Sequence, residues 1–404
     1  MARPTSRVTR VAVTGPLAPF VAAYRLRLQE SGYTPLSIVS QVRQVAHLSR
    51  WLEAGHMTGA DLTSERVEQF LAVRRAGGHG ACSLGGLMPL LEVLRGLGIL
   101  SEDQAAAPRS GSEVLLAWFR AYLLEERGLA TCTADAYVDR ACRFLAGCGI
   151  DGELATLTAA DVTRAVQRES ARVSVGSAQY FVAGLRSFLR FCFLQGLVGA
   201  DLSAAGLAVT GRRRSLLPKG ISHAHAVALS RSCDRRRSAG RRDYAVLLTL
   251  LRLGLRAGEV ARLTLDDIDW RGGEVVVHGK GRREDRLPLP ADVGEAIVGY
   301  LQRGRPTTTR REVFLRTLAP IGPLGRGGVS SIVRRACRRA GVAPVGAHRL
   351  RHTLACELVA ARVPLPEIGQ VLRQRSISST AIYARVDVES LRELALPWPG
   401  GEQR

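Results

Sequence analysis

The first half of the chain repeats itself weakly with a period of about 95–100 residues, and both copies carry apolar residues at helical spacing. The first copy places four apolar residues on one helical face, namely Ile38, Val42, Val45 and Leu52. The second copy has a similar pattern over residues 137–145. Because a strand would need a period of two, these spacings predict two small bundles of four or five helices, each closed by a glycine.

Linker-like compositions divide the chain into domains. Residues 102–112 are rich in alanine, serine and glycine, as linkers are. Residues 211–215 form a second, basic linker, which either crosses DNA or is a solvated run of charge. These boundaries give an N-terminal tail (1–17), a helical domain (18–101), the first linker, a second helical domain (113–210), the basic linker, a C-terminal domain (216–396) and a C-terminal tail (397–404).

The chain is strongly basic. Its net charge of +21 favours a polyanionic partner, most often a nucleic acid. A ribosomal-type protein or a protein of the membrane surface would also explain this charge. No apolar run reaches the roughly 18 residues that a membrane span needs, so we expect no membrane insertion. The longest run, residues 244–255, is interrupted by Arg252 and predicts a buried core helix.

The eight cysteines lack the spacing of a metal site or a redox pair. No two of them form a Cys-x-x-Cys pair, and none lies beside a histidine at zinc-finger spacing. Cys192 lies between two phenylalanines, an apolar setting typical of an inert buried thiol. We therefore expect reduced cysteines in the core, no metal, and a cytoplasmic protein.

Lysine is almost absent from this basic chain. Only Lys219 and Lys280 are lysines, and every other basic residue is arginine. An arginine does not lose its proton in proteins, whereas a lysine can. A lysine at residue 280 therefore indicates chemistry that needs an exchangeable proton, with chance as the alternative.

The C-terminal domain has a different pattern from the first half. Helical spacing predicts helices around residues 222–233, 243–253 and 257–263, and again from Val329 onward. Between them, β-branched residues predict a hairpin with strands at 274–278 and 286–289 around the turn Gly279-Lys280-Gly281. The expected fold is therefore mainly α, with a small antiparallel β-sheet in the C-terminal domain.

Four short segments of this domain carry side chains suited to phosphate chemistry. In chain order they are 253–259 (Leu-Gly-Leu-Arg-Ala-Gly-Glu), 279–281 (Gly-Lys-Gly), 348–352 (His-Arg-Leu-Arg-His) and 377–383 (Ile-Ser-Ser-Thr-Ala-Ile-Tyr). Each alone has an ordinary explanation as surface, turn or packed residues. The His-x-x-Arg-His pattern is rare, since this composition gives on the order of 0.02 chance occurrences in the chain. The ordered combination indicates an active site.

Breaking a phosphodiester without hydrolysis requires a side-chain nucleophile that keeps the bond energy in a covalent phosphoester. The oxygen of Tyr383 is suited to this role. Arg256 and Arg351 offer donor forks for the negative charge that develops on the phosphate oxygens, in place of a metal. Lys280 on a hairpin tip can protonate the leaving 5′-oxygen. His348 either accepts the Tyr383 proton or holds a phosphate oxygen.

The four segments resemble the active-site boxes of the tyrosine recombinase (phage integrase) family in order and in spacing. The likeness is greatest in residues 347–355 and 376–383. It covers residues 216–396 as the catalytic domain. Residues 113–200 resemble the helical core-site-binding domain that precedes it, and residues 18–100 resemble a second such SAM-like domain.

The resemblance implies a helical clamp around double-stranded DNA, and site-specific recombination by a homo-tetramer on two DNA sites. Strands would be exchanged through a 3′-phosphotyrosine without metal, ATP or another cofactor. The family's phosphate-activating residues fall on Arg256, Lys280, His348 and Arg351, and its nucleophile on Tyr383. Glu259 falls where the family often has an acid that orients its neighbours.

One position departs from the family pattern. The family usually has a histidine or tryptophan nine residues before the tyrosine, and Gln374 occupies that place here. Glutamine keeps an N–H donor for a phosphate oxygen but carries no charge. Arg373 or Arg375 could take over after a small backbone shift. We expect a slow or altered enzyme rather than an inactive one.

Two other functions remain open on the sequence alone. The chain could be a DNA-binding relic on a recombinase scaffold, which Gln374 favours, or a ribosome-associated basic protein, which explains only the charge. If the chain is a recombinase, its role is integration, transposition or resolution, and accessory recombination proteins are further partners. Tyr383 then acts either in cis or in trans. Trp398 in the C-terminal tail would anchor docking on a neighbouring subunit, or else pack on its own chain.

Overall fold

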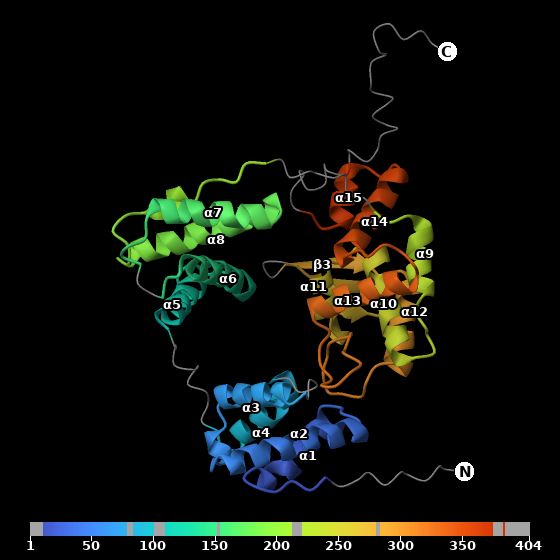
Figure 1. Cartoon of the computed structure of the whole chain (residues 1–404). Helices are drawn as coiled ribbons and strands as arrows, with labels where there is room; N and C mark the ends of the chain where they lie inside the picture. Colours follow the sequence, from blue (N-terminus) through green and yellow to red (C-terminus); the bar gives the residue numbers. More distant parts are fainter. Residues whose placement is uncertain are drawn as a thin grey trace, which may run out of the picture. The chain divides into compact units, whose positions relative to one another are not determined.

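Figure 1 shows the computed structural model of the chain, which describes residues 11–78, 84–100, 110–151, 154–211, 220–279, 283–374 and residue 383. The chain forms two compact units, one from the stretches 1–100 and 216–404 and the other from the stretch 101–215. In the described part of the chain, no helix is long and apolar enough to cross a membrane.

The N-terminal stretch of the first unit is a helical bundle. Its helices are η1 (Ala18–Phe20), α1 (Val21–Glu30), α2 (Pro35–Ala54), η2 (Gly59–Asp61), α3 (Ser64–Ala76) and α4 (Leu84–Gly96). Helix α2 begins where Thr34 accepts a hydrogen bond from the backbone N–H of Ser37, with Pro35 at the first helical position. The residues at helical spacing in the sequence, Ile38, Val42, Val45 and Leu52, are buried in this bundle's core.

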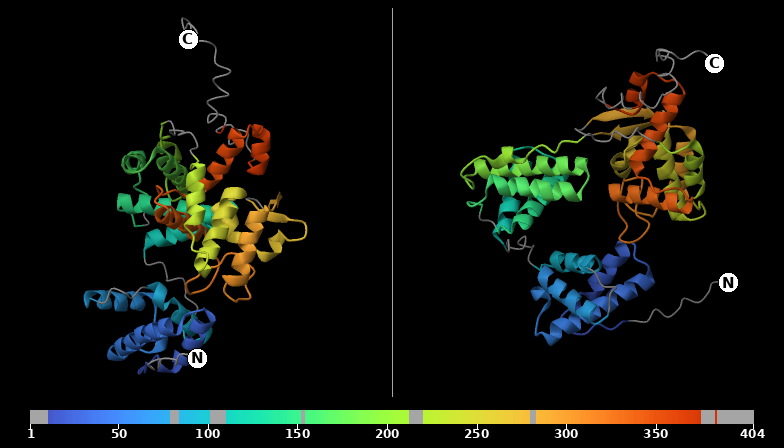
Figure 2. Two further views of the ribbon diagram at one scale, coloured as in Figure 1. Left: turned by 90° about the vertical axis from the view of Figure 1, so that its right-hand side faces the viewer. Right: turned by 45° about the horizontal axis from the view of Figure 1, so that its top comes forward.

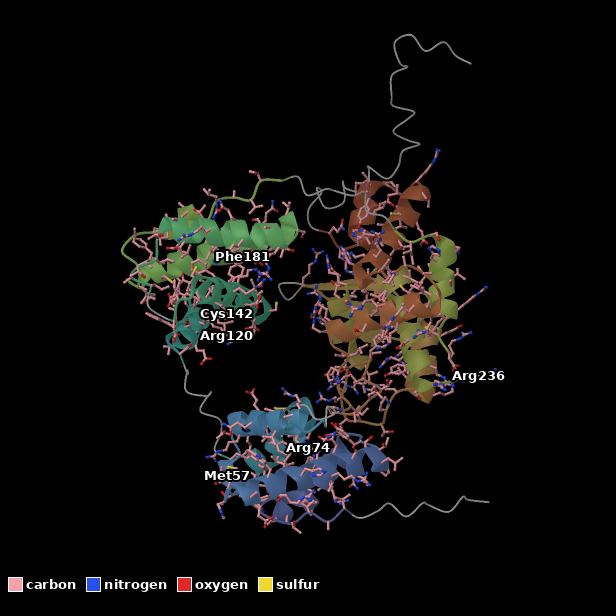
Figure 3. All side chains as sticks on the ribbon, viewed as in Figure 1. Met57, Arg74, Arg120, Cys142, Phe181 and Arg236 are labelled. Atoms are coloured by element: carbon pink, nitrogen blue, oxygen red, sulfur yellow. The ribbon has the colours of Figure 1, made fainter. Side chains whose placement is uncertain are left out.

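The second unit is a bundle of the same kind. Its helices are α5 (Gly111–Glu125), α6 (Thr131–Cys148), α7 (Ala159–Arg172), α8 (Val175–Leu194) and η3 (Leu202–Ala205). Its core is aromatic, with Phe119 packed edge-on against Phe188 and tilted against Phe191. Phe181 of α8 is also buried there (Figure 3). The prediction of two helical bundles is confirmed.

The two bundles share their turn geometry as well as their helix order. Gly32 and Gly128 both adopt left-handed backbone angles, with φ of 78° and 57°, just before the second long helix of each bundle. Gly98 and Gly196, with φ of 70° and 71°, follow the last long helix of each. A side chain at these angles would be strained, so the glycines are required by the turns. The weak sequence repeat therefore reflects a repeated structure.

The C-terminal stretch of the first unit is mainly helical. Its helices are α9 (His223–Arg231), α10 (Ser238–Arg252), α11 (Ala257–Arg262), η4 (Leu265–Asp267), α12 (Ala291–Arg303), α13 (Arg326–Arg339), α14 (Ala347–Ala360) and α15 (Leu365–Val371). Helix α10 passes through its core and is buried almost throughout its second half (Figures 1 and 2). The predicted burial of the apolar run is confirmed.

A small antiparallel sheet completes this part of the fold. Its strands are β1 (Ile268–Asp269), β2 (Glu274–His278) and β3 (Glu284–Pro288), in the order β1-β2-β3. Val276 pairs with Arg286 in the hairpin, and Val275 and Val277 turn inward to the core. The predicted hairpin and the predicted fold class are confirmed. The third, two-residue strand was not foreseen.

The cysteines correct one expectation. None of the described cysteines is in a disulfide, and Cys192 is buried as predicted. Cys132 and Cys142, however, are exposed on α6; Cys142 is labelled in Figure 3. Both lie on the polar face of an amphipathic helix. The absence of a pairing motif argues against a metal or redox site, but it does not show whether a cysteine is buried. The prediction that all cysteines are core residues was wrong.

Several predictions lie outside the described residues. These are Cys82, residues 102–109 of the first linker, the arginines of the basic linker and the C-terminal tail with Trp398. The division into the domains 18–101, 113–210 and 216–396 stays a prediction. The apolar clusters of the described residues agree with it, one in each of the first two stretches and two in the third.

Candidate active site

Helix α14 supplies the central arginine of the candidate site. The side chain of Arg351 is fully buried. Its Nη1 donates a hydrogen bond of 2.7 Å to the carbonyl of Gly254, and its Nη2 donates to the carbonyl of Leu372. The guanidinium is thus held between the end of α10 and the end of α15. A planar fork fixed in this way presents a defined set of donors.

The bend after α10 depends on Gly254. Its φ of 58° is left-handed, and a Cβ at this position would lie 2.9 Å from Cδ2 of Leu354 and 3.2 Å from Cδ2 of Leu372. Only glycine fits this backbone and this space. The bend places the carbonyl of Gly254 against Arg351, and α11 begins three residues later.

Arg256 and Glu259 form a tight pair at the start of α11. The backbone N–H of Arg256 donates to Oε2 of Glu259 at 2.8 Å, and its Nη1 donates to Oε1 at 2.6 Å. The carboxylate is buried, whereas 46% of the Arg256 side chain is exposed. The guanidinium is therefore anchored on one side and open to solvent on the other.

Two adjacent polar residues after α15, Arg373 and Gln374, bind different partners. Arg373 has a left-handed backbone with φ of 51°, and its Nη2 donates a hydrogen bond of 2.9 Å to Oε2 of Glu259. The side chain of Gln374 makes a hydrogen bond with the hydroxyl of Tyr383. These two residues join the arginine pair to the tyrosine.

Tyr383 is held inside the protein. Its ring is fully buried among Ala355, Val359, Ile368 and Leu372. Its hydroxyl lies 2.7 Å from Nδ1 of His352. Burial raises the pKa of the hydroxyl, which the hydrogen bond from Gln374 and the charge of Arg351 oppose. The tyrosine is therefore protonated at neutral pH and needs a base if it is to attack.

Both histidines of α14 favour the neutral form. Burial and the positive charge of neighbours lower the pKa of His352 to about 4. The pKa of His348 is also lowered, by loss of water around its ring and by the charges of Arg351 and Arg256. The two rings pack edge to face with centroids 4.4 Å apart. A neutral imidazole has one nitrogen free to accept a proton, so His352 can serve as a base for Tyr383.

The positive charges outnumber the negative ones around these residues. Arg256, Arg351 and Arg373 all interact electrostatically with the carboxylate of Glu259 or with one another, and Asp285 adds a second carboxylate near Arg373. Burial and the charges of the other two arginines lower the pKa of Arg351 to about 10. A phosphodiester would supply the missing negative charge.

Lys280 lies outside the described residues, as do Arg375 and residues 376–382. The base of its hairpin is described. Nε2 of His278 lies 2.8 Å from Oδ1 of Asp267, and the backbone N–H of Gly279 donates to the carbonyl of Arg283 at 2.7 Å. The hairpin is thus fixed up to the residue before Lys280.

The structure brings most of the predicted residues together. Contacts or electrostatic interactions connect Arg256, Glu259, His348, Arg351, Gln374 and Tyr383. His352 belongs to the His-x-x-Arg-His pattern, but no role was predicted for it. The spacing of four residues from His348 places both on one helical face and could have revealed it.

Comparisons with known proteins agree with this arrangement. The family model described as "Phage integrase family" matches residues 220–390. A relative named "Putative integrase/recombinase y4rA" from Sinorhizobium fredii is 40% identical over 399 residues, which cover 96% of each chain. The tyrosine recombinase XerD of Mycobacterium tuberculosis is 31% identical over 304 residues, 70% of this chain and 95% of XerD.

The chain belongs to the phage integrase family of tyrosine recombinases. The expected family and the expected class of enzyme, a tyrosine-type site-specific DNA recombinase, are confirmed, and the comparisons give no support to the DNA-binding relic.

Solved structures of tyrosine recombinases share the fold. XerH bound to a palindromic difH substrate has a TM-score of 0.56 at 16% identity, covering 81% of this chain and 93% of that one. A λ integrase dimer bound to a core site has a TM-score of 0.54 at 15% identity, covering 84% of this chain and 91% of that one. At these identities the likeness concerns the fold.

Proposed function

We propose that this tyrosine recombinase cleaves and rejoins DNA strands with Tyr383 as the nucleophile. The observation that carries the proposal is the contact between the Tyr383 hydroxyl and the neutral imidazole of His352, next to the buried Arg351. A tyrosine paired with an acceptor and lying beside a fixed cation is suited to attack on a phosphate.

In the proposed cleavage step, the Tyr383 oxygen bonds to phosphorus while its proton passes to His352. The bond between phosphorus and the 5′-oxygen breaks, and that oxygen takes a proton from Lys280. A 3′-phosphotyrosine and a free 5′-hydroxyl result. The reverse attack by a 5′-hydroxyl restores the phosphodiester, so no external energy source or cofactor enters the balance.

Arg256, Arg351 and His348 would act on the nonbridging oxygens. Arg256 is open to solvent on its unanchored side, where a DNA phosphate can reach it. The forks of Arg256 and Arg351 suit the charge that grows in the transition state. Gln374 would hold the Tyr383 hydroxyl through its hydrogen bond. It would not contact the phosphate, as the charged ring of a histidine at this position could.

The proposed partner is double-stranded DNA. The net charge of +21 supports it, as do relatives named recombinases and a transposon integrase of the same fold, solved in complex with circular intermediate DNA. We propose that the helical bundles and the catalytic domain enclose the duplex as a clamp, and that four copies join two sites. Cytoplasmic localisation, and a role in integration, transposition or resolution with accessory proteins, belong to the same proposal.

The test is to trap a covalent protein–DNA adduct on nicked suicide substrates. Sequence flanking the gene provides the substrates, and a footprint identifies the bound site. We expect an adduct with the wild type and none with Tyr383→Phe.

The control is Tyr300→Phe, which removes the hydroxyl of another buried tyrosine in the same part of the fold. It should form the adduct normally. Specific binding without an adduct from the wild type would instead identify a DNA-binding relic.

A further inference from the structure

Arg373 occupies an unusual position for an arginine. Its backbone is left-handed, which costs a residue with a side chain on the order of 1 kcal/mol. Its side chain is also removed from solvent, with 4% exposed. Arg362 has a similar left-handed backbone but is exposed, so the combination with burial distinguishes Arg373. Interactions that form around the side chain must therefore hold it in place.

Only some of the N–H donors of the Arg373 guanidinium make hydrogen bonds with the described residues. Nη2 donates to Oε2 of Glu259 at 2.9 Å. Nη1 is buried and has no hydrogen-bond partner among the described residues. A buried donor without an acceptor is costly unless something else binds there in the working state. This donor, Nη1 of Arg373, belongs to a positively charged side chain that lies beside the candidate phosphate site.

Glu259 connects Arg373 to Arg256. Its Oε1 accepts from Nη1 of Arg256, and its Oε2 accepts from both the Arg256 backbone and Arg373. The carboxylate cannot rotate without losing one of these bonds. Arg373 therefore limits the motion of Glu259, and Glu259 fixes the direction of the Arg256 side chain.

The acidic groups near Arg373 do not neutralise its positive charge. Arg256 and Glu259 interact with it electrostatically, and so does Asp285 on β3. Asp285 is already paired with Arg283, whose Nε lies 2.7 Å from its Oδ1. Glu259 is shared with Arg256. The positive charge of Arg373 is thus not consumed by its neighbours, while Gln374 next to it is neutral.

We propose that Arg373 is a positioning residue of the recombination reaction, which holds Arg256 through Glu259 and adds to the phosphate site the fixed positive charge that Gln374 lacks. This inference rests on the proposed function. It predicts that Arg373 contributes most when the scissile phosphate is charged, because its effect on the reaction is electrostatic.

The experiment compares two substrates in single-turnover cleavage. One carries the natural phosphodiester at the cleavage site, and the other carries a methylphosphonate, which has lost the negative charge of one nonbridging oxygen. Covalent adduct and any product released by hydrolysis are counted together. The readout is the ratio of the two cleavage rates for wild type, Arg373→Gln and Arg373→Lys.

Arg242→Gln is the matched control. Arg242 is likewise a buried arginine paired with a carboxylate, that of Asp243 at 2.7 Å, and it contacts none of the active-site residues. Unfolding in urea, measured for every variant, shows how much stability each substitution removes. The control therefore reports what the loss of a buried ion pair does by itself.

We expect Arg373→Gln to lower the ratio of phosphodiester to methylphosphonate cleavage by about tenfold. Arg373→Lys should recover most of that loss, and Arg242→Gln should leave the ratio at the wild-type value. An unchanged ratio in Arg373→Gln overturns the inference while leaving the proposed function intact.

Two further outcomes are decided in advance. If the wild type cleaves only the phosphodiester, the rates on that substrate decide, and equal losses in Arg373→Lys and Arg373→Gln overturn the inference. If the wild type cleaves neither substrate at a site that it binds specifically, the proposed function fails and the inference fails with it.

Discussion

The hydroxyl of Tyr383 lies 2.7 Å from Nδ1 of His352, a residue of the same helix that holds Arg351. One helix therefore carries both the acceptor for the tyrosine and the buried cation beside it. Any movement of α14 changes the two together. This coupling makes His352 the first residue to test after the nucleophile.

His352→Ala should slow cleavage by about 10- to 100-fold, because the Tyr383 hydroxyl loses its acceptor. DNA affinity should stay at the wild-type level, since the role proposed for His352 is to accept the Tyr383 proton and not to bind the phosphate. His352→Asn keeps a hydrogen-bond acceptor near the Nδ1 position but cannot take up a proton, so it should cleave about as slowly as His352→Ala. Single-turnover cleavage and a binding titration measure the two effects. A cleavage rate unchanged in His352→Ala would remove this residue from the mechanism.

The lowered pKa of His352 predicts that stability depends on pH. Its ordinary pKa of 6.5 falls to about 4 in the folded protein, so the unfolded chain binds the proton more readily. The contribution of the neutral His352 to the free energy of unfolding is fully present above pH 6.5 and is lost as the pH falls toward 4. Roughly 2–3 kcal/mol should disappear by about pH 4.5. Urea unfolding across this range should show a weaker dependence in His352→Asn, and identical slopes would contradict the assignment.

Glu259→Gln should destabilise the protein by about 3 kcal/mol, because it leaves the buried Arg373 without its counter-charge. The double variant Glu259→Gln with Arg373→Gln removes both charges. It should be clearly more stable than the sum of the two single losses predicts. A double-mutant cycle in urea gives the coupling energy. Strict additivity would mean that the ion pair contributes no coupling to the fold.

Gly254→Ala should reduce both stability and cleavage. The left-handed backbone costs about 1 kcal/mol, and the added Cβ meets Leu354 and Leu372, so we expect a loss of roughly 2–4 kcal/mol in total. The carbonyl that holds Arg351 would shift as well.

Gly341→Ala is the matched control for this variant. Its φ is 67°, but no atom lies within 4 Å of the added Cβ. It should lose only about 1 kcal/mol and keep its cleavage rate. Thermal unfolding and adduct formation distinguish the two variants, and equal behaviour would show that the space around Gly254 does not matter.

The sequence predicts the parts of the site that depend on local spacing. His348 and Arg351 share one helix turn, and Arg256 precedes Glu259 by the three residues that join a helix start to its first turn. Each such pair can be read from the chain because helix geometry fixes it. The hairpin around Lys280 can likewise be predicted from its β-branched residues and the glycines of its turn.

The rest depends on contacts between distant segments. Nothing in the sequence says that Arg373 adopts a left-handed backbone, since arginine rarely does. Its bond to Glu259 joins residues more than 100 positions apart. The acceptor of the Tyr383 hydroxyl likewise depends on how the segment after α15 packs against α14. Such contacts are set by tertiary packing, which spacing alone does not encode.

The left-handed glycines recur at the same places in the two helical bundles. Each bundle has its own apolar core. A residue with a Cβ at one of these glycines would strain the turn in that bundle and leave the core of the other untouched. Damage to one bundle can therefore be measured against the other within a single chain.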